Sequence, residues 1–197
     1  MAVGIVIWYI NVWNLEIRGF SQLLDAACYT PLAVGGAVAA IASGKAIRHM
    51  PAQYILAIGG IASTVGCILV ATQPKNQIYW AQTFPALTVV AMGPDFVFTA
   101  AQLIASNAVR RKDQGVAASL IATLASYGLS TGLGFAATVE RYTNDGGRNA
   151  VQGYRNACWL GVGLGAVATL TAVGFVRVPK DVRDGWDEAD TPESKEK

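Results

Sequence analysis

Long uncharged runs alternate along this chain with short islands of crowded charge. Five runs are long: 26–44, 54–72, 76–109 (interrupted only by Asp95), 114–139 and 156–176, and a shorter one covers 1–15. A helix that crosses ~30 Å of hydrocarbon needs about 20 mostly apolar residues. Backbone polar groups cannot stay unpaired in lipid, so each run is expected to be helical. The pattern predicts an all-α membrane protein, a bundle of six transmembrane helices.

The six predicted spans form one domain, and a polar segment follows it. The spans are expected at about 2–18, 24–46, 53–73, 78–106, 114–139 and 156–177. The first span starts at Met1 and soon reaches Glu16 and Arg18, which favours a truncated chain whose first helix begins further upstream. Residues 178–197 are charged and poor in apolar side chains, so they are expected to be a disordered cytoplasmic tail.

Composition supports a membrane protein over a soluble helical one. Hydrophobic residues make up 53% and charged residues 14%, against roughly 25% charged in an ordinary soluble domain. Five long runs without a polar stripe would be hard to cover in water. The net charge of +2 gives no indication of nucleic-acid binding.

The chain offers little for enzymatic or metal chemistry. His49 is the single histidine and the three cysteines are isolated, so no metal site, no cofactor and no Ser-His-Asp arrangement is expected. The sequence is not that of an enzyme.

Basic residues predict the direction of the spans. One set of loops and the tail carries ten Lys or Arg residues and the other set carries five. Cytoplasmic loops are enriched in these residues, so both termini are expected in the cytoplasm. Tyr79 and Trp80, and likewise Tyr154 and Trp159, stand where spans should enter from the opposite side, at the level that aromatic rings prefer.

Glycine pairs predict close contacts between helices. Gly128 and Gly132 are four residues apart, as are Gly161 and Gly165. Small residues at this spacing allow helix backbones to approach in lipid. A nucleotide-binding loop at GVGLG (161–165) is the alternative, but no strand precedes it and no acidic residue follows about 20 residues later.

Asp95 is the main candidate for a functional residue. A carboxylate near the centre of a membrane helix costs ~2.5–3.5 kcal/mol, so it is expected to face the bundle interior or an aqueous cavity. Pro94 and Gly93 directly precede it and predict a kink. Two interpretations remain open: a proton-carrying or gating residue, or a structural aspartate bonded to a neighbouring helix. Gln102, two turns further on, is expected to help satisfy it.

Three stretches carry a family resemblance: 79–109 with its GPD element, 114–140, and GYRNACWLGVGLG at 153–165. They resemble fungal transporters of the major facilitator superfamily, and among these the fourteen-span drug:proton antiporters of the aminotriazole-resistance type. Weaker likeness covers the rest of the chain except the tail. The resemblance implies that the six spans correspond to the C-terminal half of such a transporter, with Gln102 and Asn107 lining its cavity. The loop GKAIRHMP (44–51) lacks the aspartate usual in the family's basic loop.

The resulting hypothesis is proton-coupled export of small organic compounds across the plasma or vacuolar membrane. Such transporters place the substrate path between two halves, so this chain would need an N-terminal half or a second chain. The alternative is a truncated, non-transporting membrane module that packs with or modulates another membrane protein.

Overall fold

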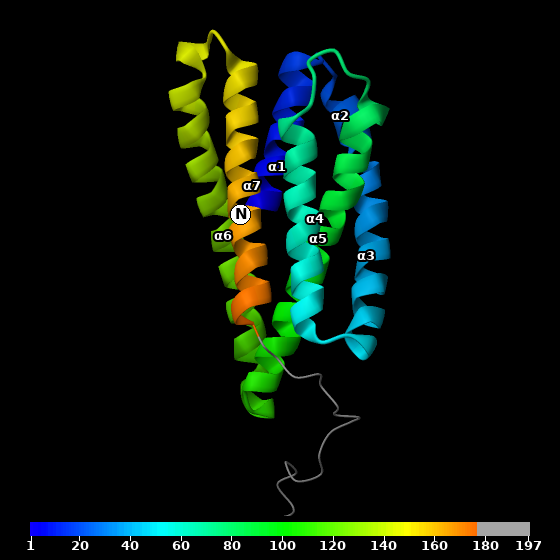
Figure 1. The fold of residues 1–197 in the computed structure, drawn as a ribbon. Coiled ribbons are helices and arrows are strands. Elements are labelled where there is room, and N and C mark those ends of the chain that lie inside the picture. The colour runs from blue at the N-terminus through cyan, green and yellow to red at the C-terminus, as the bar shows by residue number, and fades with distance from the viewer. Residues whose placement is uncertain (177–197) are drawn as a thin grey trace, which may run out of the picture.

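The computed structural model describes residues 1–176, and within that range the chain folds entirely into helices and their connections (Figure 1). The helices, in chain order, are α1 (Ala2–Val12), the π-helical turn η1 (Trp13–Ile17), α2 (Gln22–Cys28), α3 (Thr30–His49), α4 (Ala52–Ala71), α5 (Tyr79–Ala108), the 3₁₀ turn η2 (Arg111–Asp113), α6 (Gln114–Thr143), the 3₁₀ turn η3 (Asp145–Gly147) and α7 (Ala150–Phe175). The predicted tail at 178–197 lies outside the described residues.

Five helical segments are long and apolar enough to cross a membrane. They are α2 with α3 taken together (Gln22–Ile47), α4, α5, α6 and α7, and the apolar segment Ala2–Ile17 is shorter. Short connections make α4 antiparallel to both α3 and α5, so α3 and α5 run in the same direction (Figure 1). The prediction of an all-α bundle is confirmed. That each helix crosses the bilayer at the predicted limits stays a prediction.

The second predicted span is interrupted. α2 ends at Cys28, and α3 begins one residue after Tyr29 with Pro31 in its first turn. Proline has no backbone N–H and favours a helix start over a helix interior, which explains the break. The segment also starts earlier than predicted, because the Ser21 hydroxyl caps α2 by accepting from the Leu24 N–H at 3.3 Å.

The connection between the predicted spans 114–139 and 156–177 is shorter in the structure. α6 continues to Thr143 and α7 begins at Ala150, which leaves only residues 144–149 between them. The backbone reverses at Asp145, Gly146 and Gly147, all with positive φ. Both helices extend past the apolar runs, because the polar end of a helix can continue beyond the hydrocarbon.

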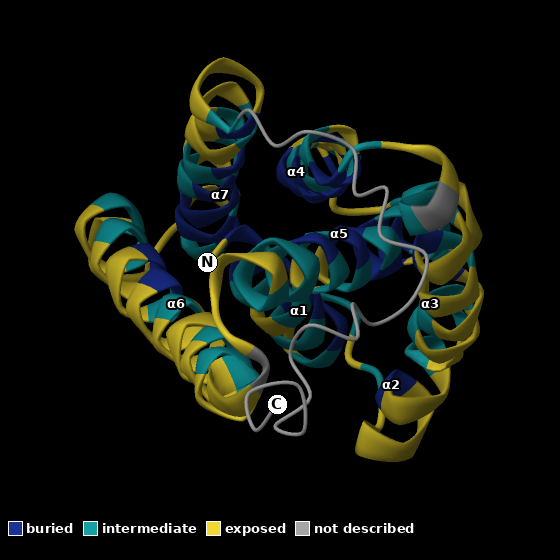
Figure 2. Cartoon of the chain, turned by 90° about the horizontal axis from the view of Figure 1, so that it is seen from below, coloured by how far each residue is buried: buried dark blue, intermediate teal, exposed yellow. Residues whose placement is uncertain are grey.

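α5 is the central helix of the bundle, in contact with both α3 and α4. Small residues permit this: a Cβ added to Gly59 of α4 would lie 2.9 Å from the Gly93 carbonyl oxygen, and one added to Gly35 of α3 would lie 3.1 Å from the Ala91 Cβ. One core cluster joins α1, α4, α5 and α7, and a smaller one joins α3, α4 and α5. Figure 2 shows that buried positions concentrate there, whereas α6 and the outer side of α3 are largely exposed.

The contact between Gly59 and Gly93 yields a prediction about stability. Replacing Gly59 with alanine should lower the melting temperature in detergent, by an amount corresponding to about 1–3 kcal/mol, because the added methyl meets backbone atoms that cannot move independently. Gly163→Ala, in α7 with no atom within 4 Å of the new methyl, is the matched control. It should be neutral or stabilising, since alanine favours helix. Equal melting temperatures for the two variants would contradict the close contact.

Candidate functional site

Asp95 lies on the side of α5 that packs against α3. A Cβ added to Gly36 of α3 would lie 3.6 Å from the Asp95 Oδ2, and the carboxylate is half-buried. One turn further along α5, the Thr99 hydroxyl donates to the Asp95 backbone oxygen at 2.6 Å, and it lies 3.3 Å from the Ser43 hydroxyl of α3. The carboxylate therefore occupies an interface between two helices, beside a small residue that leaves it room.

The Asp95 carboxylate makes no hydrogen bond or ion pair with any residue between 1 and 176; its backbone oxygen accepts the one bond described above. The alternative of a structural aspartate, tied to a neighbouring backbone or hydroxyl group, finds no such bond in the structure. A half-exposed carboxylate with free lone pairs is a group that can take up and release a proton, or receive a donor from outside the bundle.

Gln102 does not satisfy Asp95, contrary to expectation. Its side-chain amide donates to the Ala118 backbone oxygen of α6 at 3.4 Å. Seven residues of helix separate the two side chains by ~10.5 Å along the axis, which is too far for a direct bond. Gln102 thus links α5 to α6. Asn107 is exposed and lies in the last turn of α5, one residue before the helix ends.

The four predicted packing glycines face other parts of the bundle at different distances. A Cβ added to Gly132 would lie 2.8 Å from the Met1 Cα, and one added to Gly128 would lie 3.8 Å from the Met1 nitrogen. The corresponding position at Gly161 is 3.0 Å from the Cys67 Sγ. Gly165 faces Thr64 of α4, at 3.3 Å from its Cα.

Gly93 and Pro94 have different surroundings although they are adjacent. Gly93 is buried against Ser63 of α4, whereas Pro94 is exposed. Pro85, which sequence reasoning passed over, also lies inside α5. Each proline removes a backbone donor from the helix that carries Asp95.

A second polar site, which sequence reasoning missed, surrounds Asp25 in α2. This carboxylate is only 4% exposed. The Asn11 amide donates to Oδ2 at 2.6 Å, and the Asn14 amide donates to Oδ1 at 2.8 Å. The Arg18 guanidinium in turn donates to the Asn14 side-chain oxygen at 3.0 Å, so an amide connects the buried acid to a cation. The signal available in the sequence was the pair of asparagines three residues apart in an otherwise apolar helix.

Further bonds tie this end of the bundle together. Arg18 donates to the Gln77 backbone oxygen at 3.2 Å, and Arg155 of α7 donates to the Gln73 backbone oxygen at 2.7 Å. Tyr9 of α1 donates to the Glu140 carboxylate of α6 at 2.7 Å. The first helix, the connection between α4 and α5, and the last two helices are therefore joined by polar contacts at one end.

In the part of the chain that the structure describes, no group of three His, Cys, Asp or Glu side chains is placed to hold a metal ion. The arrangement of apolar helices of spanning length, with carboxylates sheltered between them, is that of a polytopic membrane protein.

No family model matches the chain, but curated relatives do. It is 38% identical to the low affinity ammonium transporter of Saccharomyces cerevisiae over 86% of this chain and 33% of that protein. It is 37% identical to efflux pump terJ of Aspergillus terreus, over 88% and 34%. It is 30% identical to the aminotriazole resistance protein of Saccharomyces cerevisiae, over 86% and 31%.

These homologues are fungal transporters and efflux pumps of the major facilitator type, which confirms the resemblance found in the sequence. The chain spans about a third of the length of the relatives it matches. The protein is thus an integral, multi-pass membrane protein related to transporters.

The Asp25 site yields a prediction about stability. Asp25→Ala should destabilise the protein by about 1–3 kcal/mol, because the buried Asn14 amide and the half-buried Asn11 amide lose their acceptor. Thermal unfolding in detergent, followed by tryptophan fluorescence, measures the change. Asp113→Ala is the control, since that carboxylate is exposed and makes no side-chain cap. If both variants melt at the wild-type temperature, the network does not stabilise the fold.

Proposed function

We propose that this chain forms the C-terminal six-helix half of a proton-coupled exporter of small organic compounds. Both termini would lie in the cytoplasm, and the membrane would be the plasma or the vacuolar membrane. Asp95 carries the coupling proton or gates the path, and Pro94 and Gly93 let α5 bend beside it. The tail 178–197 would extend into the cytoplasm.

The state of Asp95 is the observation that carries this proposal. The carboxylate lies within an apolar spanning helix, at the contact between α3 and α5, with none of its lone pairs engaged by residues 1–176. Such a group is expensive in a membrane protein unless it faces water or a partner during function. The relatives include transporters and efflux pumps by name, which agrees with a transport role.

The exposure of α6 supports the need for a second half. Only 6% of its most apolar window is buried, against 56% for α4. Its exposed side carries Ser119, Thr123, Ser126 and Ser130, spaced along one face of the helix. The first three hydroxyls donate to backbone oxygens of α6 itself. A stripe of small, internally satisfied residues lets another helix approach closely.

The Asp95→Asn variant tests the coupling role. In proteoliposomes that contain this chain with an N-terminal half, pH-driven flux of aminotriazole or methylammonium should fall at least tenfold, because an amide cannot exchange the proton. Asp95→Glu should keep part of the flux, and Asp113→Asn, on the exposed connection before α6, should keep all of it.

Immunoblotting of the reconstituted vesicles should show equal amounts of all variants. Unchanged pH-driven flux in Asp95→Asn would dismiss the proton-carrying role. Flux that is absent even from the wild type, over a broad panel of compounds and with an N-terminal half present, would favour the non-transporting module.

A further inference from the structure

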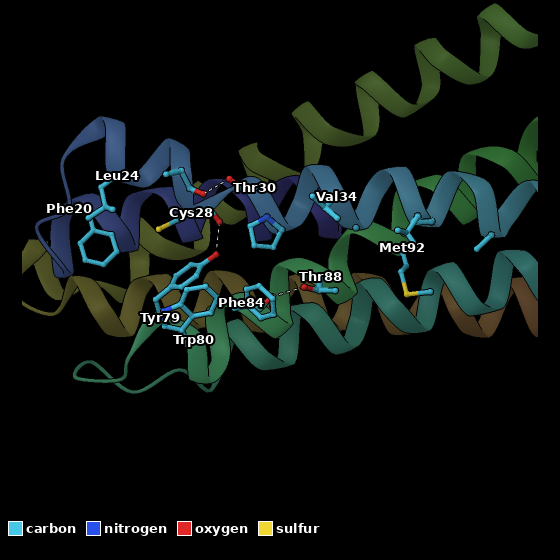
Figure 3. A pocket seen from close by; sticks show the side chains of 16 residues that line it. Phe20, Leu24, Cys28, Thr30, Val34, Tyr79, Trp80, Phe84, Thr88 and Met92 are labelled. Atoms are coloured by element: carbon cyan, nitrogen blue, oxygen red, sulfur yellow. Dashed lines mark hydrogen bonds between the residues drawn. The ribbon is translucent and has the colours of Figure 1, made fainter.

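An apolar groove follows the junction of α3 with α5. It has a volume of about 820 Å³. Its principal lining residues are Leu24 of α2, Val34 and Val38 of α3, and Trp80, Phe84 and Met92 of α5. Figure 3 shows their side chains gathered between α3 and the first half of α5. Asp95 is not part of the lining, and neither is any described residue of α1, α6 or α7.

The few polar groups at the groove already have partners. The Thr30 hydroxyl donates to the Ala27 backbone oxygen at 2.7 Å, and the Thr88 hydroxyl donates to the Phe84 backbone oxygen at 3.0 Å. The Tyr79 hydroxyl donates to the Cys28 backbone oxygen at 2.6 Å. The groove therefore offers methyl groups, methylenes and ring faces, and little that would hold ordered water or a polar ligand.

The dimensions of the groove select among apolar occupants. From Trp80 to Met92 the helix rises ~18 Å, close to the ~15 Å of one hydrocarbon leaflet. A lining of methyl groups and ring faces over the depth of one leaflet suits a hydrocarbon chain that lies along α5.

Aromatic side chains mark one end of the groove. Trp80 is 68% exposed, its ring centroid lies 5.5 Å from that of Tyr79, and it lies 5.1 Å from that of Phe84. These three residues occupy the first two turns of α5. Aromatic rings prefer the level of the lipid headgroups, so this end of the groove is expected at that level. An occupant that entered along the helix would have its polar end at these rings and its apolar end near Met92.

We propose that this groove binds one acyl chain of a membrane phospholipid, drawn from the leaflet at the end of the bundle where α5 begins. The chain lies along α5 between Trp80 and Met92, and its headgroup stays at the aromatic end. The bound acyl chain fills space beside the contact between α3 and α5. Asp95 lies at the same contact, about one turn beyond Met92 along α5.

Photocrosslinking in liposomes tests the proposal. The chain is reconstituted in phosphatidylcholine with a trace of phosphatidylcholine that carries a diazirine on its acyl chain, and adducts are mapped by mass spectrometry after irradiation. Adducts should be at least fivefold more frequent in 24–42 and 80–92 than on the exposed faces of α6 and α7.

Filling the groove should remove these adducts. Val38→Phe should lower them at least fivefold, whereas Val167→Phe should not; the two valines are 62% and 60% exposed, and only Val38 lines the groove. If Val38→Phe does not fold, as judged by its melting temperature, Val34→Phe serves instead. Equal labelling of all exposed faces would show annular lipid only, and a groove free of adducts would show that protein covers it. Either result overturns the proposal.

Discussion

Close contact between helix backbones is the constraint on which this bundle depends. α5 touches α3 and α4 at once because glycines lie at the contact points, Gly35 and Gly36 on one side and Gly59 and Gly66 on the other. Burial of large apolar side chains gives little drive for association in lipid, so dispersion contacts between closely packed backbones take on that role. Asp95 has its place as a consequence, since a larger residue at position 36 would occupy the space beside its carboxylate.

The two buried acids show two ways of keeping a carboxylate in an apolar bundle. Asp25 is almost fully enclosed, and two asparagine amides donate to it while Arg18 approaches through one of them. Such a satisfied network stabilises one arrangement of the helices. Asp95 is half-buried and has no such donors in the described part of the chain. The first suits a fixed end of the bundle and the second suits a group that changes its protonation or its partner.

Much of the fold could be predicted from the sequence because lipid imposes simple rules. The lengths of uncharged runs gave the helices, and the GPD element led to Asp95. What could not be predicted depends on contacts between distant segments. The break at Tyr29 follows from Pro31 together with the turn that places Asp25 under α1. Gln102 donates to a backbone oxygen of α6 and does not reach Asp95. The spacing of residues in the sequence does not reveal this contact between two helices.

The similarity to fungal transporters and the position of Asp95 are two independent observations, and both agree with the proposed transport role. Most of the chain is similar in sequence to fungal transporters of the major facilitator type. The structure adds which faces of the bundle are left uncovered, α6 and α3, and which carboxylate lies at the contact between α3 and α5.

Solvent access at position 95 tests the central claim, that packed helices keep this side chain away from lipid. Asp95→Cys, in a chain whose three native cysteines are replaced, is treated in membranes with a charged thiol reagent, and Val167→Cys serves as the lipid-facing reference. The account predicts that the thiol at position 95 reacts with the charged reagent and that the reference does not. Reaction at position 95 only with a lipid-soluble maleimide, as at the reference position, would contradict it.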